Sequence, residues 1–272
     1  MPHITTPGGT RLFYSDEGEG QPILCLAGLS RTTRDFDYAM PALKGYRVIR
    51  MDYRGRGQSD WADYKTYTIP QEAQDALRLL DHLGLREVGV IGTSRGGLIA
   101  MGLGLAARDR LRGVCLVDIG PELDPAGLSV ISAYIGKNPA FKSHTEMAAA
   151  MPNLMKGFAN VPTARWMEEV RKHYVETERG LQITYDPKLL DALIDAGAQP
   201  MPNMWPFFDG LQGMPLALIR GANSDLLTLE TANEMRKRQP DMLFADVPDR
   251  AHIPYLDEPE AVFILQTWAA ML

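Results

Sequence analysis

The residue of this sequence best placed to act as a nucleophile is Ser94, which stands between two glycines. Residues 88–91 form an apolar run, Gly92-Thr-Ser94-Arg-Gly96 follows, and residues 97–107 are apolar on every side. This order predicts a strand, a tight turn and a buried helix, with the serine hydroxyl exposed above the sheet. A Cβ at either glycine would collide with the neighbouring strand or helix. The helix would direct its positive end at the site, where an oxyanion would form.

A serine hydroxyl is a weak nucleophile, so its use in catalysis requires further residues. A histidine must remove its proton during attack and return it to the leaving group. A buried carboxylate must hold the imidazole in the correct tautomer and stabilise its cation. The chain has five histidines, at positions 3, 82, 144, 173 and 252. Which histidine and which carboxylate lie beside the serine therefore depends on where the strands and helices place them.

Short apolar runs alternate with helical patterns along most of the chain. Strands are expected at 11–15, 22–26, 47–51, 88–91, 113–117, 216–220 and 243–247, and most lack the polar alternation of half-exposed strands. Helices are expected at 70–83, 97–107, 228–239 and 257–271. The cluster Asp16-Glu-Gly-Glu-Gly20 predicts a hairpin turn between the first two strands. Alternating strands and helices predict a doubly wound, mostly parallel α/β sheet.

Three segments besides the serine turn carry a resemblance to a known family. They are Met51-Asp-Tyr-Arg-Gly-Arg-Gly-Gln-Ser-Asp60, Pro215-Leu-Ala-Leu-Ile-Arg-Gly-Ala-Asn-Ser-Asp225 and Val247-Pro-Asp-Arg-Ala-His-Ile-Pro254. Over nearly its whole length the chain resembles the α/β-hydrolase superfamily. The resemblance implies an eight-stranded sheet whose core spans 1–118 and 215–272, with a helical lid at 119–214 inserted after the sixth strand. Residues 119–214 contain no convincing strand, and helices are expected at 163–177 and 188–196. We assign the first segment a structural role.

The same resemblance assigns the site, because the family's catalytic residues run in the order serine, acid, histidine. It implies Ser94 as the nucleophile and His252, in the loop before the last helix, as the base. We favour Asp225, after the seventh strand, as the acid, with Asp118 at the end of the preceding strand as the alternative. The backbone N–H groups of Leu29 and Arg95 are expected to form the oxyanion hole. Ala27 stands where the family commonly has histidine in this loop, whereas the following glycine is kept.

Composition excludes several other classes of protein. The net charge is −6 with no Lys/Arg run, so a nucleic-acid partner is not expected. No apolar stretch approaches the roughly 20 residues that span a bilayer, and no signal peptide is recognisable, which predicts a soluble cytoplasmic protein without a membrane partner. Cys25 and Cys115 lie in apolar runs and are expected to be buried and reduced. No metal-ligand or phosphate-loop motif occurs, so neither a cofactor nor a metal is expected.

The sequence thus predicts a cofactor-independent serine hydrolase for a small-molecule substrate. The expected reaction is cleavage of a small or medium, largely apolar carboxylic ester or lactone through an acyl-enzyme on Ser94. Two alternatives remain open, a carbon–carbon bond hydrolase of ring-fission diketones and a ligand sensor that does not turn over. Either a monomer or a homodimer is compatible with the sequence.

Overall fold

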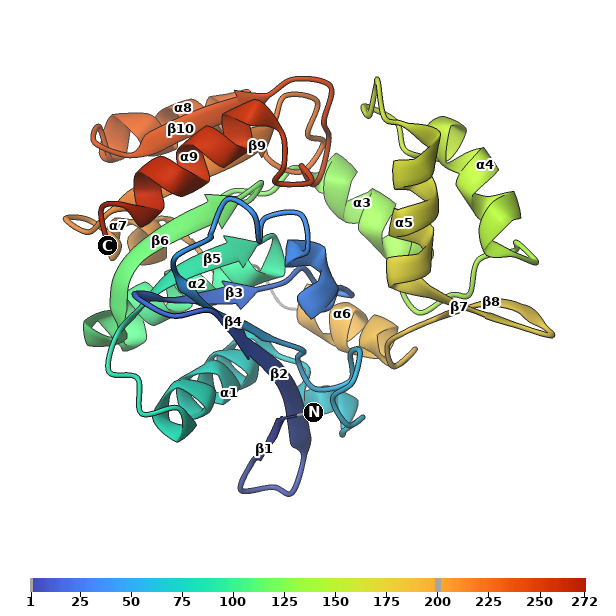
Figure 1. Ribbon diagram of the computed structural model, residues 1–272, viewed down its shortest axis with the longest axis horizontal. Coiled ribbons are helices and arrows are strands. Elements are labelled where there is room, and N and C mark those ends of the chain that lie inside the picture. Colours follow the sequence, from blue (N-terminus) through green and yellow to red (C-terminus); the bar gives the residue numbers. More distant parts are fainter. Residues whose placement is uncertain (1, 199–201) are drawn as a thin grey trace.

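The centre of the protein is a twisted eight-stranded sheet (Figure 1), seen in a computed structural model that describes residues 2–198 and 202–272. Its strands follow the order β1-β2-β4-β3-β5-β6-β9-β10. Strand β2 pairs antiparallel with β1 and β4, and the remaining pairs are parallel. The mostly parallel, eight-stranded α/β sheet is therefore confirmed. The bounds are β1 (His3–Thr5), β2 (Arg11–Glu17), β3 (Pro22–Leu26), β4 (Arg47–Met51), β5 (Val88–Thr93), β6 (Leu111–Val117), β9 (Leu216–Gly221) and β10 (Leu243–Val247).

Helices cover both faces of this sheet (Figure 1). On one face α1, α2 and α8 bury side chains such as Leu79, Ile99 and Met235 against the sheet. On the other face α9 and the 3-10 turn η1 do the same with Trp268 and Phe36. Strands sandwiched in this way have no polar face, which explains their continuous apolar runs. The bounds are α1 (Ile69–His82), α2 (Arg95–Ala106), α8 (Leu229–Arg238), α9 (Pro259–Ala269), η1 (Thr33–Phe36), η2 (Tyr64–Thr66) and η3 (Arg108–Arg110).

An insertion connects β6 to β9, and part of it forms a lobe beside the sheet (Figure 1). The elements are α3 (Pro125–Tyr134), α4 (His144–Leu154), α5 (Thr163–His173), β7 (Tyr174–Thr177), β8 (Gly180–Ile183), α6 (Leu189–Gly197) and α7 (Trp205–Asp209). Residues 199–201 of the predicted lid range lie outside the described residues. The expectation of an insertion without strands is wrong, because β7 and β8 form an antiparallel hairpin. Each strand has only four residues, and β7 has no buried residue, so the hairpin lacks the continuous apolar runs used to find the other strands.

The predicted hairpin between β2 and β3 is also wrong, because β4 lies between them in the sheet. The glycines that suggested a hairpin turn have another function. Gly18 has a φ of +82°, and a Cβ there would lie 2.4 Å from the carbonyl oxygen of Tyr46. Gly20, with a φ of +105°, approaches the carbonyl of Gly45 in the same way, at 2.5 Å. The glycines therefore let the chain pass close to the turn that leads into β4.

The turn after β4 has the structural role expected for residues 52–60. The buried Asp52 carboxylate accepts hydrogen bonds from the backbone N–H groups of Thr33 (2.7 Å) and Gln58 (2.9 Å). Arg54 makes two hydrogen bonds to Asp75 of α1, at 2.7 and 2.8 Å, and both side chains are buried. These contacts fix the turn against η1 and α1.

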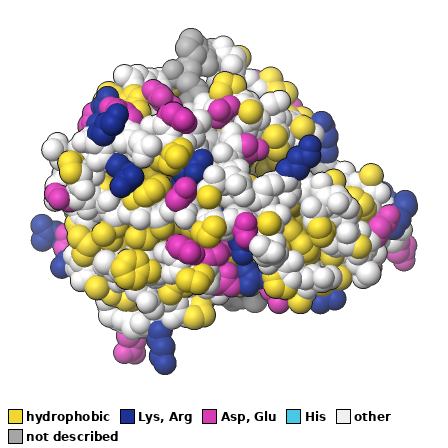
Figure 2. Space-filling model, turned by 90° about the horizontal axis from the view of Figure 1, so that it is seen from above, with side chains coloured by type: hydrophobic (Ala, Val, Ile, Leu, Met, Phe, Trp, Pro, Cys, Tyr) yellow, Lys and Arg dark blue, Asp and Glu magenta, His cyan; other side chains and the backbone are white. Residues whose placement is uncertain are grey.

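Both cysteines are buried and free, as predicted. Burial raises the pKa of the Cys25 thiol to about 12 and also raises the pKa of Cys115, so neither thiol is an accessible nucleophile. In the part of the chain that the structure describes, no helix is both long and apolar enough to cross a membrane. Acidic and basic side chains are interspersed over the face seen in Figure 2, without a large region of one sign.

Candidate active site

Ser94 lies on the sharp turn between β5 and α2, in a conformation that is rare for a non-glycine residue. Its φ is 49° and its ψ is −114°. A Cβ at Gly92 would lie 2.6 Å from the carbonyl oxygen of Gly96, and a Cβ at Gly96 would lie 2.0 Å from that of Leu26 in β3. Both glycines are therefore needed for the helix to begin so close to two strands. The expected strained turn is confirmed, and it is a form of strain that clusters at functional sites.

His252 meets this serine from the loop between β10 and α9. Its Nε2 lies 3.0 Å from Ser94 Oγ, and its side chain is 13% exposed. The other ring nitrogen, Nδ1, lies 2.7 Å from Oδ2 of Asp118. The three side chains thus form one continuous chain of contacts from the hydroxyl to a carboxylate that is completely buried.

The preference for Asp225 as the acid is corrected by this geometry. Asp225 lies in the turn after β9 and is exposed, and within the described ranges no hydrogen bond joins it to His252. Asp118 follows the last residue of β6 and has a φ of +50°, which bends the chain away from the strand direction. Strands β6 and β9 are neighbours in the sheet, so both carboxylates end near the histidine loop. The backbone conformation of Asp118 decides which of them reaches it.

A residue that sequence reasoning missed completes the carboxylate's environment. Ser224 donates its hydroxyl to Asp118 Oδ2 at 2.6 Å, while the Gly221 backbone N–H donates to Oδ1 at 2.8 Å. The Ser224 hydroxyl in turn accepts from the N–H groups of Leu226 and Leu227 at 3.2 and 3.1 Å. Asp118 is therefore held by donors on both oxygens, which fixes its orientation toward His252. Nothing in the sequence distinguishes Ser224 from other turn serines.

The two predicted oxyanion donors follow β3 and β5, which are neighbouring parallel strands of the sheet. Leu29 follows β3 and Arg95 is the first residue of α2. Among the described residues, neither backbone N–H has a protein acceptor. Two free N–H groups of this kind can donate hydrogen bonds to a negative oxygen, and the N-terminus of α2 adds its partial positive charge. The Arg95 side chain points elsewhere, with its Nε 2.5 Å from Glu72 Oε2.

A charged cluster joins the insertion to the loop after β3. Arg31 contacts His173 of α5, and Glu169 lies 3.4 Å from His173 and 3.4 Å from Lys172. Burial raises the pKa of Glu169, but the hydrogen bond with His173 and the charges of Arg31 and Lys172 outweigh it and lower this pKa to about 2. Burial and the Arg31 charge lower the pKa of His173. The cluster therefore holds an ionised Glu169 between α5 and the core.

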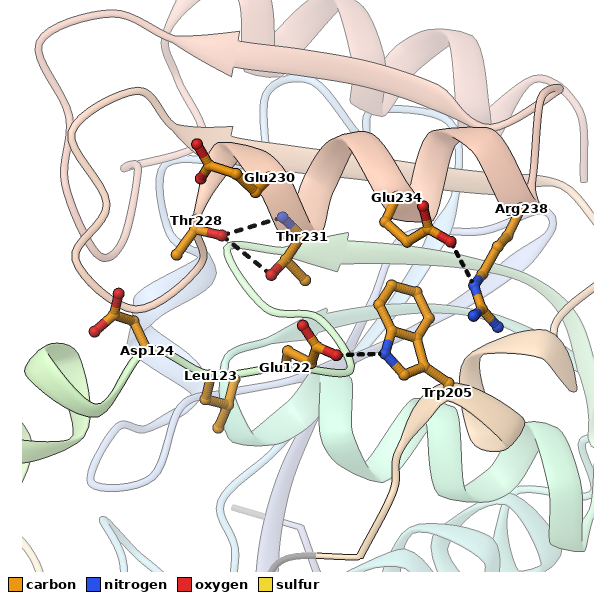
Figure 3. Close-up of a pocket in the computed structure, with 9 residues that line it drawn as sticks. All are labelled: Glu122, Leu123, Asp124, Trp205, Thr228, Glu230, Thr231, Glu234 and Arg238. Carbon is orange, nitrogen blue, oxygen red and sulfur yellow. Dashed lines mark hydrogen bonds and ion pairs between the residues drawn. The ribbon is translucent and has the colours of Figure 1, made fainter.

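A separate cavity of about 450 Å³ lies between the β6–α3 connection, α7 and α8 (Figure 3). The indole N–H of Trp205 donates to Glu122 on one wall, and Glu234 pairs with Arg238 on another (Figure 3). Its lining contains none of Ser94, His252 and Asp118. It is thus distinct from the site around the serine.

The fold and the serine–histidine–carboxylate arrangement are those of one class of protein. A model of the alpha/beta hydrolase family matches residues 23–264, and the chain belongs to this family. It is 35% identical over 275 residues to a 3-hydroxybutyrate-oligomer hydrolase of Cupriavidus necator, covering 96% of this chain and 93% of that protein. An alpha/beta hydrolase from Novosphingobium aromaticivorans superimposes with a TM-score of 0.92 at 34% identity, covering 100% of this chain and 98% of that one. The structure of E-2-(acetamidomethylene)succinate hydrolase, with a TM-score of 0.81, 19% identity and 99% coverage of both chains, shares the fold. By its family and its fold, the protein is therefore a hydrolase.

Proposed function

We propose that this protein is a serine hydrolase that cleaves a small or medium carboxylic ester, with Ser94 as nucleophile, His252 as base and Asp118 as acid. The observation that carries the proposal is the unbroken chain of contacts from Ser94 Oγ through both ring nitrogens of His252 to Asp118. A nucleophile within hydrogen-bond reach of a base that is itself oriented by a carboxylate is the geometry that acyl transfer requires.

In the proposed mechanism, Ser94 Oγ attacks the carbonyl carbon of the ester while His252 Nε2 accepts the hydroxyl proton. The carbonyl oxygen becomes negative and accepts hydrogen bonds from the N–H groups of Leu29 and Arg95. The carbon–oxygen bond to the alcohol then breaks, and His252 gives its proton to the departing alcohol. Water, deprotonated by His252, attacks the acyl-enzyme and releases the acid with Ser94 restored.

The apolar surroundings of Leu29 support a largely apolar substrate. Leu29 packs against a cluster that includes Ile135, Tyr185 and Leu189 of the insertion. In this proposal the cluster forms one wall of the substrate pocket, and an apolar wall favours an aliphatic acyl or alkyl group. The name of the relative from Cupriavidus necator supports a short ester of a hydroxy acid as the substrate class. In this proposal residues 119–214 act as a lid that completes the pocket.

The test is steady-state hydrolysis of p-nitrophenyl esters of increasing acyl length, with Ser94→Ala as the control, followed by the linear dimer of 3-hydroxybutyrate. We expect sustained turnover that disappears in the variant, and the best acyl length would measure the pocket. A single burst that equals the enzyme concentration would instead indicate a sensor without turnover. Hydrolysis that persists in Ser94→Ala would refute the assigned nucleophile.

A further inference from the structure

The loop that carries the first oxyanion donor is anchored at three successive carbonyl groups. The Ala27 carbonyl accepts from the Tyr53 hydroxyl (3.1 Å), and the Gly28 carbonyl accepts from the Arg31 N–H (3.2 Å). The Leu29 carbonyl accepts from Nε of Arg56 at 2.9 Å. In a trans peptide the N–H points away from the carbonyl of the same unit, so these bonds set the direction of the Leu29 N–H. Arg56 holds the peptide unit immediately after that donor.

Arg56 is completely buried, which is rare for a charged side chain. Its Nη1 donates to the Arg54 carbonyl at 2.6 Å and lies 3.0 Å from Glu72 Oε1, and its guanidinium lies over the rings of Tyr53 and Tyr67. Its remaining nitrogen, Nη2, is buried and has no hydrogen-bond partner in the part of the chain that the structure describes. Burying a charged side chain with an unpaired nitrogen destabilises the folded state. Its presence here therefore points to a role for Arg56 in the site.

The second oxyanion donor is tied to the same carboxylate. Glu72 of α1 is also completely buried, and its Oε2 lies 2.5 Å from Nε of Arg95. Arg95 Nη2 donates in addition to the Tyr67 carbonyl at 2.9 Å. Glu72 therefore contacts Arg56 with one oxygen and Arg95 with the other. Leu29 and Arg95, which supply the two free N–H groups, are the two ends of one buried network.

We propose that Arg56 and Glu72 are positioning residues that hold the two oxyanion donors of this site at a fixed separation. The inference rests on the proposed function, because it assumes that an oxyanion forms between Leu29 and Arg95. Neither side chain touches the substrate, and each acts through the backbone or side chain of a donor residue.

The network also places net positive charge next to the two donor residues, because Arg56 contacts Leu29 and Arg95 is itself one of them. It contains two guanidinium groups and one carboxylate, so one positive charge remains. Burial lowers the pKa of Arg56, Glu72 opposes this effect, and Arg95 lowers the pKa further. Charge that is fixed and shielded from water stabilises a developing oxyanion more strongly than charge in solvent. The same groups therefore orient the two N–H donors and stabilise the negative charge on the oxygen that accepts from them.

The test compares Arg56→Met and Arg56→Lys with the matched controls Arg54→Met and Arg54→Lys. Arg54 belongs to the same turn and forms a buried ion pair with Asp75, but its side chain contacts neither Leu29 nor Arg95. The measurements are kcat and KM for a p-nitrophenyl ester, the melting temperature, and the affinity for an alkyl boronic acid. A boronic acid forms a tetrahedral anion on the serine and so reports on the oxyanion hole without turnover.

We expect Arg56→Met to lose about tenfold to hundredfold in kcat and in boronic-acid affinity together, with KM changed by less than about threefold, since loosening a donor costs less than removing it. Arg56→Lys should recover part of this loss, because an ammonium group can reach the Leu29 carbonyl but not Glu72 as well. The Arg54 variants should lower the melting temperature while keeping kcat within about threefold.

Unchanged kcat and boronic-acid affinity in a folded Arg56→Met protein would overturn the inference. It would also be overturned if Arg54→Met lost as much kcat as Arg56→Met, because the effect would then be one of stability. If Arg56→Met does not fold, Arg56→Lys decides the question. The proposed function itself is tested separately, with the unsubstituted protein. If that protein shows neither Ser94-dependent turnover nor boronic-acid binding, the proposed function and this inference are both overturned.

Discussion

Replacing Asp118 with asparagine changes which nitrogen of His252 carries its proton. In the wild-type protein Asp118 Oδ1 accepts from the Gly221 N–H and Oδ2 accepts from His252 Nδ1. The amide oxygen of an asparagine would stay on Gly221, so its NH₂ group would face Nδ1 and donate to it. The imidazole would then carry its proton on Nε2, 3.0 Å from Ser94 Oγ, and could not accept the hydroxyl proton.

The size of the effect follows from these contacts. Turning the amide round restores the productive tautomer but leaves two buried donors, the NH₂ group and the Gly221 N–H, facing each other at about 1–3 kcal/mol each. Loss of the charge-assisted hydrogen bond to the imidazolium removes about 1.5–3 kcal/mol more. Together these effects are about 3.5–9 kcal/mol, so kcat should fall about 4 × 10²- to 4 × 10⁶-fold. Asp225→Asn, at an exposed position, should change kcat by less than about twofold.

The assay is steady-state hydrolysis of the best p-nitrophenyl ester by both variants, with circular dichroism to verify folding. Asp225→Asn is the matched control, because it makes the same chemical change at the other carboxylate that follows a strand of the sheet. A folded Asp118→Asn protein that keeps more than about a tenth of the wild-type kcat would refute the assignment of the acid. Equal losses in both variants would show that the hydrogen-bond argument is wrong.

Three further changes test the site and its supports. Ser94→Ala should fold normally and lose all covalent labelling by a fluorophosphonate, detected by intact mass; labelling that persists would place the nucleophile elsewhere. Gly96→Ala should destabilise the protein by more than about 2 kcal/mol in urea unfolding, since its Cβ would lie 2.0 Å from the Leu26 carbonyl oxygen. Gly102→Ala, in the same helix with nothing within 4 Å, should instead stabilise it by up to about 1 kcal/mol, and equal effects would contradict the packing argument. Glu169 has its pKa lowered from 4.5 to about 2, so it stabilises the fold above pH 4.5 and this stabilisation is lost as the pH falls toward 2. The difference in melting temperature between wild type and Glu169→Gln should therefore be largest near neutral pH and shrink in acid, and a pH-independent difference would contradict this.

The sequence alone was sufficient for seven of the eight strands and for the turn that carries Ser94, but it missed β1 and the position of β4 between β2 and β3. Parallel strands buried on both faces leave continuous apolar runs, and a strand–turn–helix unit needs glycines at two positions only a few residues apart. Both signals are local, so they can be read without knowing which strands are neighbours. His252 was identified through the resemblance to the α/β-hydrolase superfamily, from its place in the loop between the last strand and the last helix.

The tertiary structure alone decided which carboxylate orients the histidine. Asp118 and Asp225 each follow a strand, and these strands are adjacent, so sequence position did not separate the two. The choice depends on the positive φ of Asp118 and on the N–H and hydroxyl donors of Gly221 and Ser224, which come from a distant part of the chain. The network of Arg56, Glu72 and Arg95 was invisible for the same reason. Hydrogen bonds between side chains that are far apart in sequence leave no periodic pattern, and only the packing of β4, α1 and α2 brings these three charges together.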